Sequence, residues 1–217
     1  MWAAAEPLPT REQLDAALRG RIGPALWQRF QGAKVAVCGL GGLGSHIAVA
    51  LARAGVGALS LIDFDKVDLS NLNRQQYKAS QIGREKPLAL AENLREINPY
   101  LGLECHTLRL TPENIPAVLQ GADVICEAFD QADQKAMLTE AILTGLPDTP
   151  LVSGSGMAGW GSANAIQTVH RFGHFYVCGD GESDIADGVG LTAPRVAVCA
   201  AHQATMVMRL LLGQTNP

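Results

Sequence analysis

The stretch that decides the fold runs from Lys34 to Gln75 and reads KVAVCGLGGLGSHIAVALARAGVGALSLIDFDKVDLSNLNRQ. It begins with a short apolar run, Val35 to Cys38, and continues into a cluster of glycines, Gly39, Gly41, Gly42 and Gly44. Small apolar residues then recur at helical spacing, at Ile47, Ala50, Leu51 and Ala54. A second apolar run, Leu59 to Ile62, ends on Asp63. This order of strand, glycine turn, helix, strand and acid predicts a βαβ nucleotide-binding unit.

Each part of this unit has a physical reason to meet a nucleotide. Glycines let the backbone turn sharply, so that its N–H groups can approach phosphate oxygens. The helix that follows directs the positive end of its dipole at the same place. Asp63, at the end of the second strand, is suited to accept hydrogen bonds from the hydroxyl groups of a ribose.

The polar loop after Asp63 favours a triphosphate over a nicotinamide cofactor. Arg74 can bind phosphate oxygens with two parallel hydrogen bonds, a capacity that a dehydrogenase does not need at this point. Asn71 and Gln75 can donate hydrogen bonds to phosphate or ribose. Asp65 has two open interpretations, a contact with the ligand or a role in the structure of the loop.

Three segments, GLGGLGS at 39–45, LIDFDKVDLSNLNRQ at 61–75 and GREKP at 83–87, resemble the ThiF/MoeB/HesA family of ubiquitin-activating-enzyme-like proteins. The resemblance extends from about Lys34 to the end of the chain and is greatest to the compact ThiF branch of thiamine biosynthesis. It implies that ATP is used to adenylate the C-terminal glycine of a small ubiquitin-like sulfur carrier that ends in Gly-Gly. A ThiS-like carrier is the first expectation, and a molybdopterin-type carrier is the alternative.

The resemblance also implies roles for residues outside the βαβ unit. Lys86 falls at the position of the family's triphosphate-binding lysine, at the start of a helix expected over residues 84–97. Asp130 falls at the position of the aspartate that holds Mg²⁺, so ATP and Mg²⁺ are the expected ligands. Two neighbours depart from the family pattern, because Gln131 stands in place of an asparagine and Lys135 in place of an arginine.

The length and composition are typical of a soluble globular protein of one domain. The 217 residues are 47% hydrophobic and 18% charged, and the formal net charge of −4 argues against a nucleic-acid binder. No apolar run of about 18 uncharged residues suggests a membrane span. Residues 1–10 lack the basic and apolar regions of a signal peptide. The cysteines are not at CxxC spacing, so we expect no structural zinc and a cytoplasmic location.

The chain divides into an N-terminal helical segment, residues 1–33, and an adenylyltransferase domain, residues 34–217. Apolar residues at four-residue steps predict one or two helices over residues 10–30. The family resemblance suggests a homodimer in which an N-terminal arginine reaches the nucleotide of the neighbouring subunit. Arg11, Arg19 and Arg21 are available, but none of them matches the family's arginine motif, so none is given that role.

The C-terminal half predicts additions to a parallel sheet. We expect strands over residues 103–110, 123–127 and 150–153, and antiparallel strands over residues 163–171 and 174–178. A short helix is expected to begin with Thr111 as its N-cap, and longer helices over residues 132–143 and 194–212. A polar loop, residues 179–193, reads as mobile. The predicted fold is therefore an α/β, Rossmann-like, doubly wound and mainly parallel sheet, extended by antiparallel strands.

Other interpretations remain open at this point. A nicotinamide-dependent oxidoreductase would explain the glycines and Asp63 but would leave Arg74, Lys86 and Asp130 without a role. A non-catalytic partner, like the inactive half of a heterodimeric activating enzyme, is a further class. Some relatives attach the carrier to a cysteine, and Cys178 is the best candidate here, although an incidental thiol at a strand end is the favoured interpretation.

Overall fold

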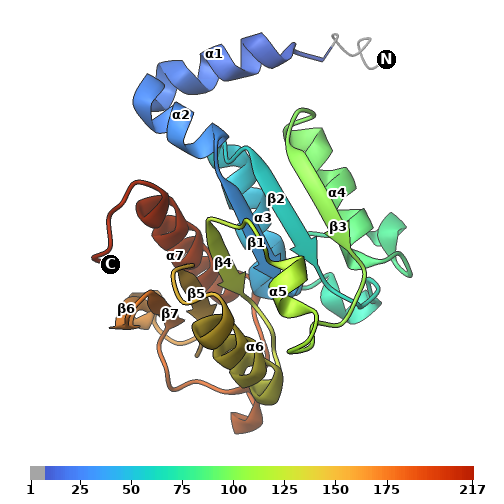
Figure 1. Ribbon diagram of the computed structural model, residues 1–217. Coiled ribbons are helices and arrows are strands. Elements are labelled where there is room, and N and C mark those ends of the chain that lie inside the picture. The colour runs from blue at the N-terminus through green and yellow to red at the C-terminus, as the bar shows by residue number, and fades with distance from the viewer. Residues whose placement is uncertain (1–7) are drawn as a thin grey trace.

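The computed structural model describes residues 8–217 and contains a seven-stranded sheet with the strand order β3-β2-β1-β4-β5-β7-β6 (Figure 1). Its strands are β1 (Lys34–Cys38), β2 (Ala58–Ile62), β3 (Gly102–His106), β4 (Val124–Glu127), β5 (Leu151–Gly154), β6 (Gln167–Phe172) and β7 (Phe175–Gly179). Its helices are α1 (Arg11–Ile22), α2 (Pro24–Gln31), α3 (Gly42–Ala54), α4 (Lys86–Ile97), α5 (Ile115–Val118), α6 (Ala132–Gly145) and α7 (Ala193–Leu211).

Six strands of the sheet run parallel, and β6 pairs antiparallel with β7 at one edge. The central strands β1, β4 and β5 are buried along nearly their whole length, which explains their continuous apolar sequences. The predicted α/β, doubly wound and mainly parallel sheet is therefore confirmed. The antiparallel extension is narrower than expected, since β7 itself runs parallel to β5.

Helices cover both faces of the sheet and enclose two apolar clusters. One cluster joins the sheet to α3, α4 and α7, with Ile47, Leu94 and Val207 among its fully buried side chains. The other joins the opposite face to α5 and α6 through Ile115 and Leu138. Because six strands between these layers run parallel, their carboxyl ends meet at one edge of the sheet.

Two expectations for residues 103–114 were wrong. The strand β3 ends at His106, because its neighbour β2 ends at Ile62 and offers no further partner after Asp63. The short helix α5 begins at Ile115 and not after Thr111. The Asn114 side chain closes a turn by accepting the Thr111 N–H at 2.9 Å, so Pro112 lies in that turn, ahead of the helix.

The N-terminal helices lie at the far end of the sheet, beyond the starts of β1 and β2 (Figure 1). Two of their arginines stack on aromatic rings of this same chain, Arg11 on Tyr100 and Arg19 on Trp27. The part of the predicted N-terminal segment that falls on residues 1–7 lies outside the described residues. Among residues 8–217, no helix combines the length and the apolarity needed to cross a membrane.

Candidate nucleotide site

A cavity of about 550 Å³ opens at the carboxyl ends of β1, β2 and β4. Its wall contains all but one of the predicted site residues, and these are Gly39, Gly41, Gly42, Asp63, Asp65, Asn71, Arg74, Gln75, Lys86 and Asp130. Gly44 is the exception, because it lies inside α3 and is buried. Ligands of open α/β sheets bind at this edge, and the volume is that of an ordinary small-molecule site.

Three glycines of the turn, Gly39, Gly42 and Gly44, are packed so tightly that they leave no room for a side chain. Gly39 has φ of 88°, and a Cβ there would lie 2.9 Å from the Ala128 carbonyl oxygen. A Cβ on Gly44 would collide with the carbonyl oxygen of Gly39. A Cβ on Gly42 would lie 2.9 Å from a methyl group of Val196 on α7. The turn is therefore fixed by close contacts with β4 and α7 as well as by its own conformation.

Asp63 holds the glycine turn and the following loop together. Its Oδ2 accepts a hydrogen bond from the Leu40 N–H at 2.7 Å, and its Oδ1 accepts one from the Asp65 N–H at 2.8 Å. The residue is only 7% exposed. Each carboxylate oxygen keeps a second lone pair, so Asp63 can also accept from a ligand hydroxyl.

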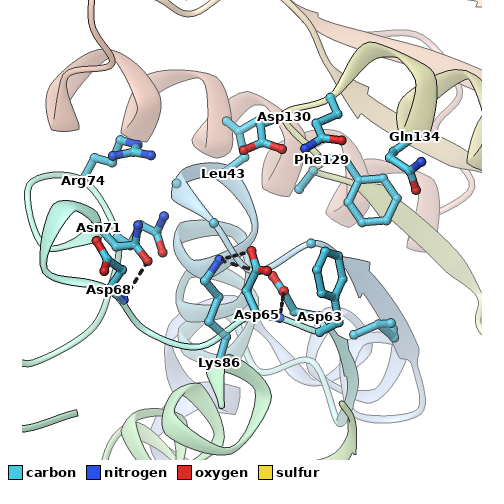
Figure 2. A pocket seen from close by; sticks show the side chains of 18 of the residues that line it. Leu43, Asp63, Asp65, Asp68, Asn71, Arg74, Lys86, Phe129, Asp130 and Gln134 are labelled. Carbon is cyan, nitrogen blue, oxygen red and sulfur yellow. Dashed lines mark hydrogen bonds and ion pairs between the residues drawn. The ribbon is translucent and has the colours of Figure 1, made fainter. Parts of the chain in front are cut away.

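Lys86 presents a positive charge to the cavity. Its ammonium lies 3.0 Å from the Asp65 carboxylate and 3.8 Å from that of Asp63, and its side chain is 7% exposed (Figure 2). The residue opens α4, where the helix dipole disfavours a cation. The two acids offset that cost, which indicates that negative charge belongs beside Lys86.

The loop after β2 brings a second cation to the same wall (Figure 2). Arg74 donates through Nη1 to the Ser70 carbonyl at 3.1 Å and to Asn73 Oδ1 at 2.8 Å. Its buried Nε and the buried Oε1 of Gln75 have no hydrogen-bond partner within the described chain. Asn71 caps the preceding turn, where its Oδ1 accepts from the Asp68 N–H at 3.0 Å.

Asp130 lies on the wall that faces these cations (Figure 2). It is exposed, and within the described residues it makes no hydrogen bond or ion pair. The loop that carries it is supported from behind by Glu127 and Lys135. Lys135 therefore has a partner in this chain at the position where the family resemblance led us to expect an arginine.

Sequence reasoning missed the Glu127–Lys135 pair, although a signal was present. The strand β4 ends on an acid, Glu127, just as β2 ends on Asp63, and a buried acid at a strand end needs a partner. It also missed the rim of the cavity, where Arg109 stacks 4.2 Å above the ring of Phe64. Both residues follow the ends of neighbouring strands.

The C-terminal half supplies the remaining wall through Met157, Leu191 and Val196. Leu191 belongs to the segment of residues 179–193, which the sequence suggested to be a mobile loop. Side-chain contacts hold that loop at its start and at its end. Asp180 pairs with the buried Arg195, and the Thr192 hydroxyl donates to the Gly159 carbonyl at 2.9 Å. Burial opposes the charge on Asp180, but hydrogen bonds from the Ser183 and Glu182 amides, the Ser183 hydroxyl and Arg195 outweigh it and lower its pKa to about 2.

None of the five cysteines is among the residues that line the cavity. Cys178 is fully buried under the sheet edge, and burial raises its pKa to about 11. Burial likewise raises the pKa of Cys199 to about 12. Among residues 8–217, no three side chains of His, Cys, Asp or Glu gather in a group that could hold a metal ion.

Comparisons with known proteins identify the family of this chain. A sequence model described as the ThiF family matches residues 14–217. The chain is 34% identical over 151 residues to the sulfur carrier protein adenylyltransferase of Thermus thermophilus, covering 67% of this chain and 55% of that protein. It is 31% identical over 192 residues to the adenylyltransferase and sulfurtransferase MOCS3 of Anopheles gambiae, covering 85% of this chain and 42% of that protein. The chain thus spans about half the length of these curated relatives.

Solved structures share the fold. The E. coli tRNA N6-threonylcarbamoyladenosine dehydratase TcdA superimposes with a TM-score of 0.84 at 24% identity, over 93% of this chain and 95% of that one. A structure of the same dehydratase in complex with ATP gives a TM-score of 0.83. At 24% identity, this similarity shows that the two proteins share a fold and nothing further.

Proposed function

The chain belongs to the ThiF family, and on that premise we propose that it uses ATP to adenylate the C-terminal carboxylate of a small ubiquitin-like sulfur carrier protein. One observation carries the proposal. A single cavity gathers a strand-end acid, two cations and two amides on one wall and an unpaired aspartate on the other. The name of the Thermus thermophilus relative, a sulfur carrier protein adenylyltransferase, supports the same reaction.

The proposed reaction demands little covalent chemistry from the protein. The terminal carboxylate of the carrier attacks the α-phosphorus of ATP, a bond to the carboxylate oxygen forms, and pyrophosphate leaves with the electrons of the broken P–O bond. A carboxylate is already nucleophilic at neutral pH, so the protein needs no serine, cysteine or general base. It must hold two anions together and stabilise the charge that develops on the phosphates.

The residues of the cavity can divide this task. The backbone N–H groups of the glycine turn would approach the phosphates, and Asp63 would accept from the ribose hydroxyls. Arg74 and Lys86 would bind the phosphate oxygens that leave as pyrophosphate. Asn71 and Gln75 would add neutral hydrogen bonds, and the free Nε of Arg74 and Oε1 of Gln75 leave capacity for a ligand.

Asp130 fits a magnesium ion that arrives with ATP. Mg²⁺ is commonly bound through one or two carboxylates together with substrate phosphates, and Asp130 is an exposed carboxylate without a partner on the cavity wall. When bound, Mg²⁺ would neutralise charge on the phosphate oxygens as a Lewis acid. Asp130 would hold the ion, and the two cations on the facing wall would hold the phosphates.

We propose a ThiS-like carrier of thiamine thiazole biosynthesis as the substrate, with a molybdopterin-type carrier as the alternative. Support for the ThiS-like carrier comes from the cysteines, whose lack of CxxC spacing tilts the family resemblance toward the compact thiamine branch. One cavity would serve either carrier, because both end in the same Gly-Gly carboxylate. A homodimer is proposed on the family resemblance.

Mass spectrometry of the carrier would test the function. The chain is incubated with ATP, Mg²⁺ and a ThiS-like or a molybdopterin-type carrier, and the carrier is weighed. We expect a carrier–AMP adduct that disappears without ATP and with a carrier that lacks its terminal glycine. No adduct with any Gly-Gly carrier, together with tighter binding of NAD than of ATP·Mg²⁺, would instead support an oxidoreductase. No adduct despite tight ATP·Mg²⁺ binding would support a non-catalytic partner.

A further inference from the structure

Glu127 is the most deeply buried carboxylate near the cavity, yet it does not line the cavity. Its side chain is fully buried, and both of its oxygens lie within 3.0 Å of the Lys135 ammonium, at 3.0 and 2.7 Å. The Ser153 hydroxyl also donates to it. A buried carboxylate with this many hydrogen-bond partners is held in one position.

Glu127 and Lys135 together bind both backbone polar groups of Phe129, its N–H and its carbonyl. The Phe129 N–H donates to Glu127 Oε1 at 2.7 Å, and Lys135 Nζ donates to the Phe129 carbonyl at 3.2 Å. Because a peptide unit is planar, holding the Phe129 carbonyl also fixes the peptide plane that leads into Asp130. The direction in which Asp130 leaves the backbone is therefore set by two side chains that do not line the cavity.

The neighbouring contacts of the loop do not replace these two hydrogen bonds to Phe129. The preceding residue is fixed by the sheet, since the Ala128 N–H donates to the Cys38 carbonyl at 2.8 Å. After Asp130, α6 begins at Ala132, and its N-cap Gln131 makes no side-chain capping hydrogen bond. Within the described chain, Asp130 itself has no side-chain partner that could orient it.

We infer that Glu127 and Lys135 are positioning residues that aim Asp130 at the cavity. The inference rests on the proposed function for its effect on the reaction, but the geometry of the loop is a property of the free protein. Two measurements therefore separate the claims: the hydrogen exchange of the Phe129 amide without ligand, and ATP–pyrophosphate exchange in the presence of a carrier.

In the first measurement, nuclear magnetic resonance follows the exchange of the Phe129 amide in wild type, Lys135→Met and Lys135→Arg. We expect exchange to rise roughly tenfold or more in Lys135→Met, because the loop opens locally, and to return to the wild-type rate in Lys135→Arg. Lys34→Met is the control, because the Lys34 ammonium pairs with the Glu104 carboxylate at a distance of 2.8 Å and neither residue lines the cavity. An unchanged rate in Lys135→Met would overturn the inference, whether or not the protein adenylates a carrier.

The second measurement is a double-mutant cycle with Asp130→Ala. Lys135→Met should lower the kcat of pyrophosphate exchange by roughly tenfold to a hundredfold in the wild-type background, the cost of a misplaced group. In the Asp130→Ala background it should lower kcat less than about twofold, because Lys135 acts on the reaction through the position of Asp130. Equal losses in both backgrounds would overturn the inference, as would the failure of Lys135→Arg to restore activity.

A second variant allows both measurements to be made if Lys135→Met does not fold. If Lys135→Met leaves Glu127 unpaired and the protein unfolds, the double variant Glu127→Gln/Lys135→Met removes both charges together. The same outcomes are expected of it. If the wild-type chain shows no pyrophosphate exchange with any carrier, the proposed function fails, and the amide measurement still decides the role of the pair.

Discussion

The Lys86 ammonium lies 3.0 Å from the Asp65 carboxylate, although the lysine side chain is 7% exposed and the aspartate is half exposed. The two residues come from different elements, the loop after β2 and the first turn of α4. Asp65 supplies the negative charge that Lys86 requires at a helix start. A phosphate that entered the cavity would supply this negative charge beside Lys86 in place of Asp65. Asp65 is half exposed, so its side chain could then turn to solvent.

Replacing Lys86 by alanine should therefore lower ATP–pyrophosphate exchange by about 10²-fold or more, the usual cost of removing one charge-stabilising donor. The control is Lys78→Ala, because Lys78 forms a surface pair with Glu96 and is 51% exposed. Thermal unfolding of both variants would be followed in parallel. Wild-type exchange by a folded Lys86→Ala protein would remove Lys86 from the proposed site.

Arg74→Ala should lose exchange activity to a similar extent, and Arg74→Lys should recover little of it. A lysine carries the charge but cannot make two parallel hydrogen bonds to a phosphate. The Nη1 contacts of Arg74 are to the Ser70 carbonyl and to Asn73, so the fold should tolerate the change. Full rescue by lysine would show that charge alone is needed there.

Gly44→Ala should lower the free energy of unfolding by at least about 2 kcal/mol, because the new methyl group collides with the Gly39 carbonyl oxygen. Gly20→Ala is the matched control, since Gly20 lies within α1 and has no neighbouring atom within 4 Å. That variant should gain about 0.5–1 kcal/mol from helix propensity. Urea unfolding measures both, and equal stabilities would contradict the tight packing of the turn.

Asp180→Asn should be less stable than wild type at pH 7, by about 3 kcal/mol, because Arg195 loses its charged partner in a buried site. The pKa of Asp180 is lowered from 3.8 to about 2, so its charge stabilises the fold above pH 4 and that contribution disappears as the pH falls towards 2. Urea midpoints of the two proteins should therefore converge below pH 4. A difference that stayed constant down to pH 2 would contradict a charge-based role.

Cys178→Ser should adenylate a carrier at a rate close to that of wild type. Burial keeps the Cys178 thiol protonated at neutral pH, since its pKa is about 11, and a thiol is a poor nucleophile. Native protein should also react slowly with iodoacetamide at this position, as peptide mass spectrometry can determine. A thiol-sensitive conjugate between the chain and a carrier, absent from the serine variant, would show the opposite.

Much of the fold could be predicted because its signals are local. The buried strands β1 and β2 read as continuous apolar runs, and the glycines and Asp63 between and after them lie in one stretch. The ends of elements were harder to place. The strand β3 stops where β2 stops, and no feature of its own sequence marks that point.

The site residues that lie close together in the sequence could be predicted, as the local elements of the fold could. Asp63, Asn71, Arg74 and Gln75 stand close together in the sequence, so one motif covers them. The partners Asp180 and Arg195, and the wall residues Leu191 and Val196, depend on how α7 returns to the glycine turn. Only a folded chain brings these groups together, and a single sequence holds no direct record of that contact.

The contact of Val196 with Gly42 joins regions that lie about 154 residues apart in the sequence, so Val196 leaves the ribosome well after Gly42. A nascent chain that has emerged only as far as β5 would already contain the glycine turn, Arg74, Lys86 and Asp130, but it would lack the helix that backs them. Such a chain cannot form the complete cavity while α7 is still inside the ribosome tunnel. Nucleotide added to stalled ribosomal complexes should consequently protect the chain from proteolysis only after α7 has left the tunnel.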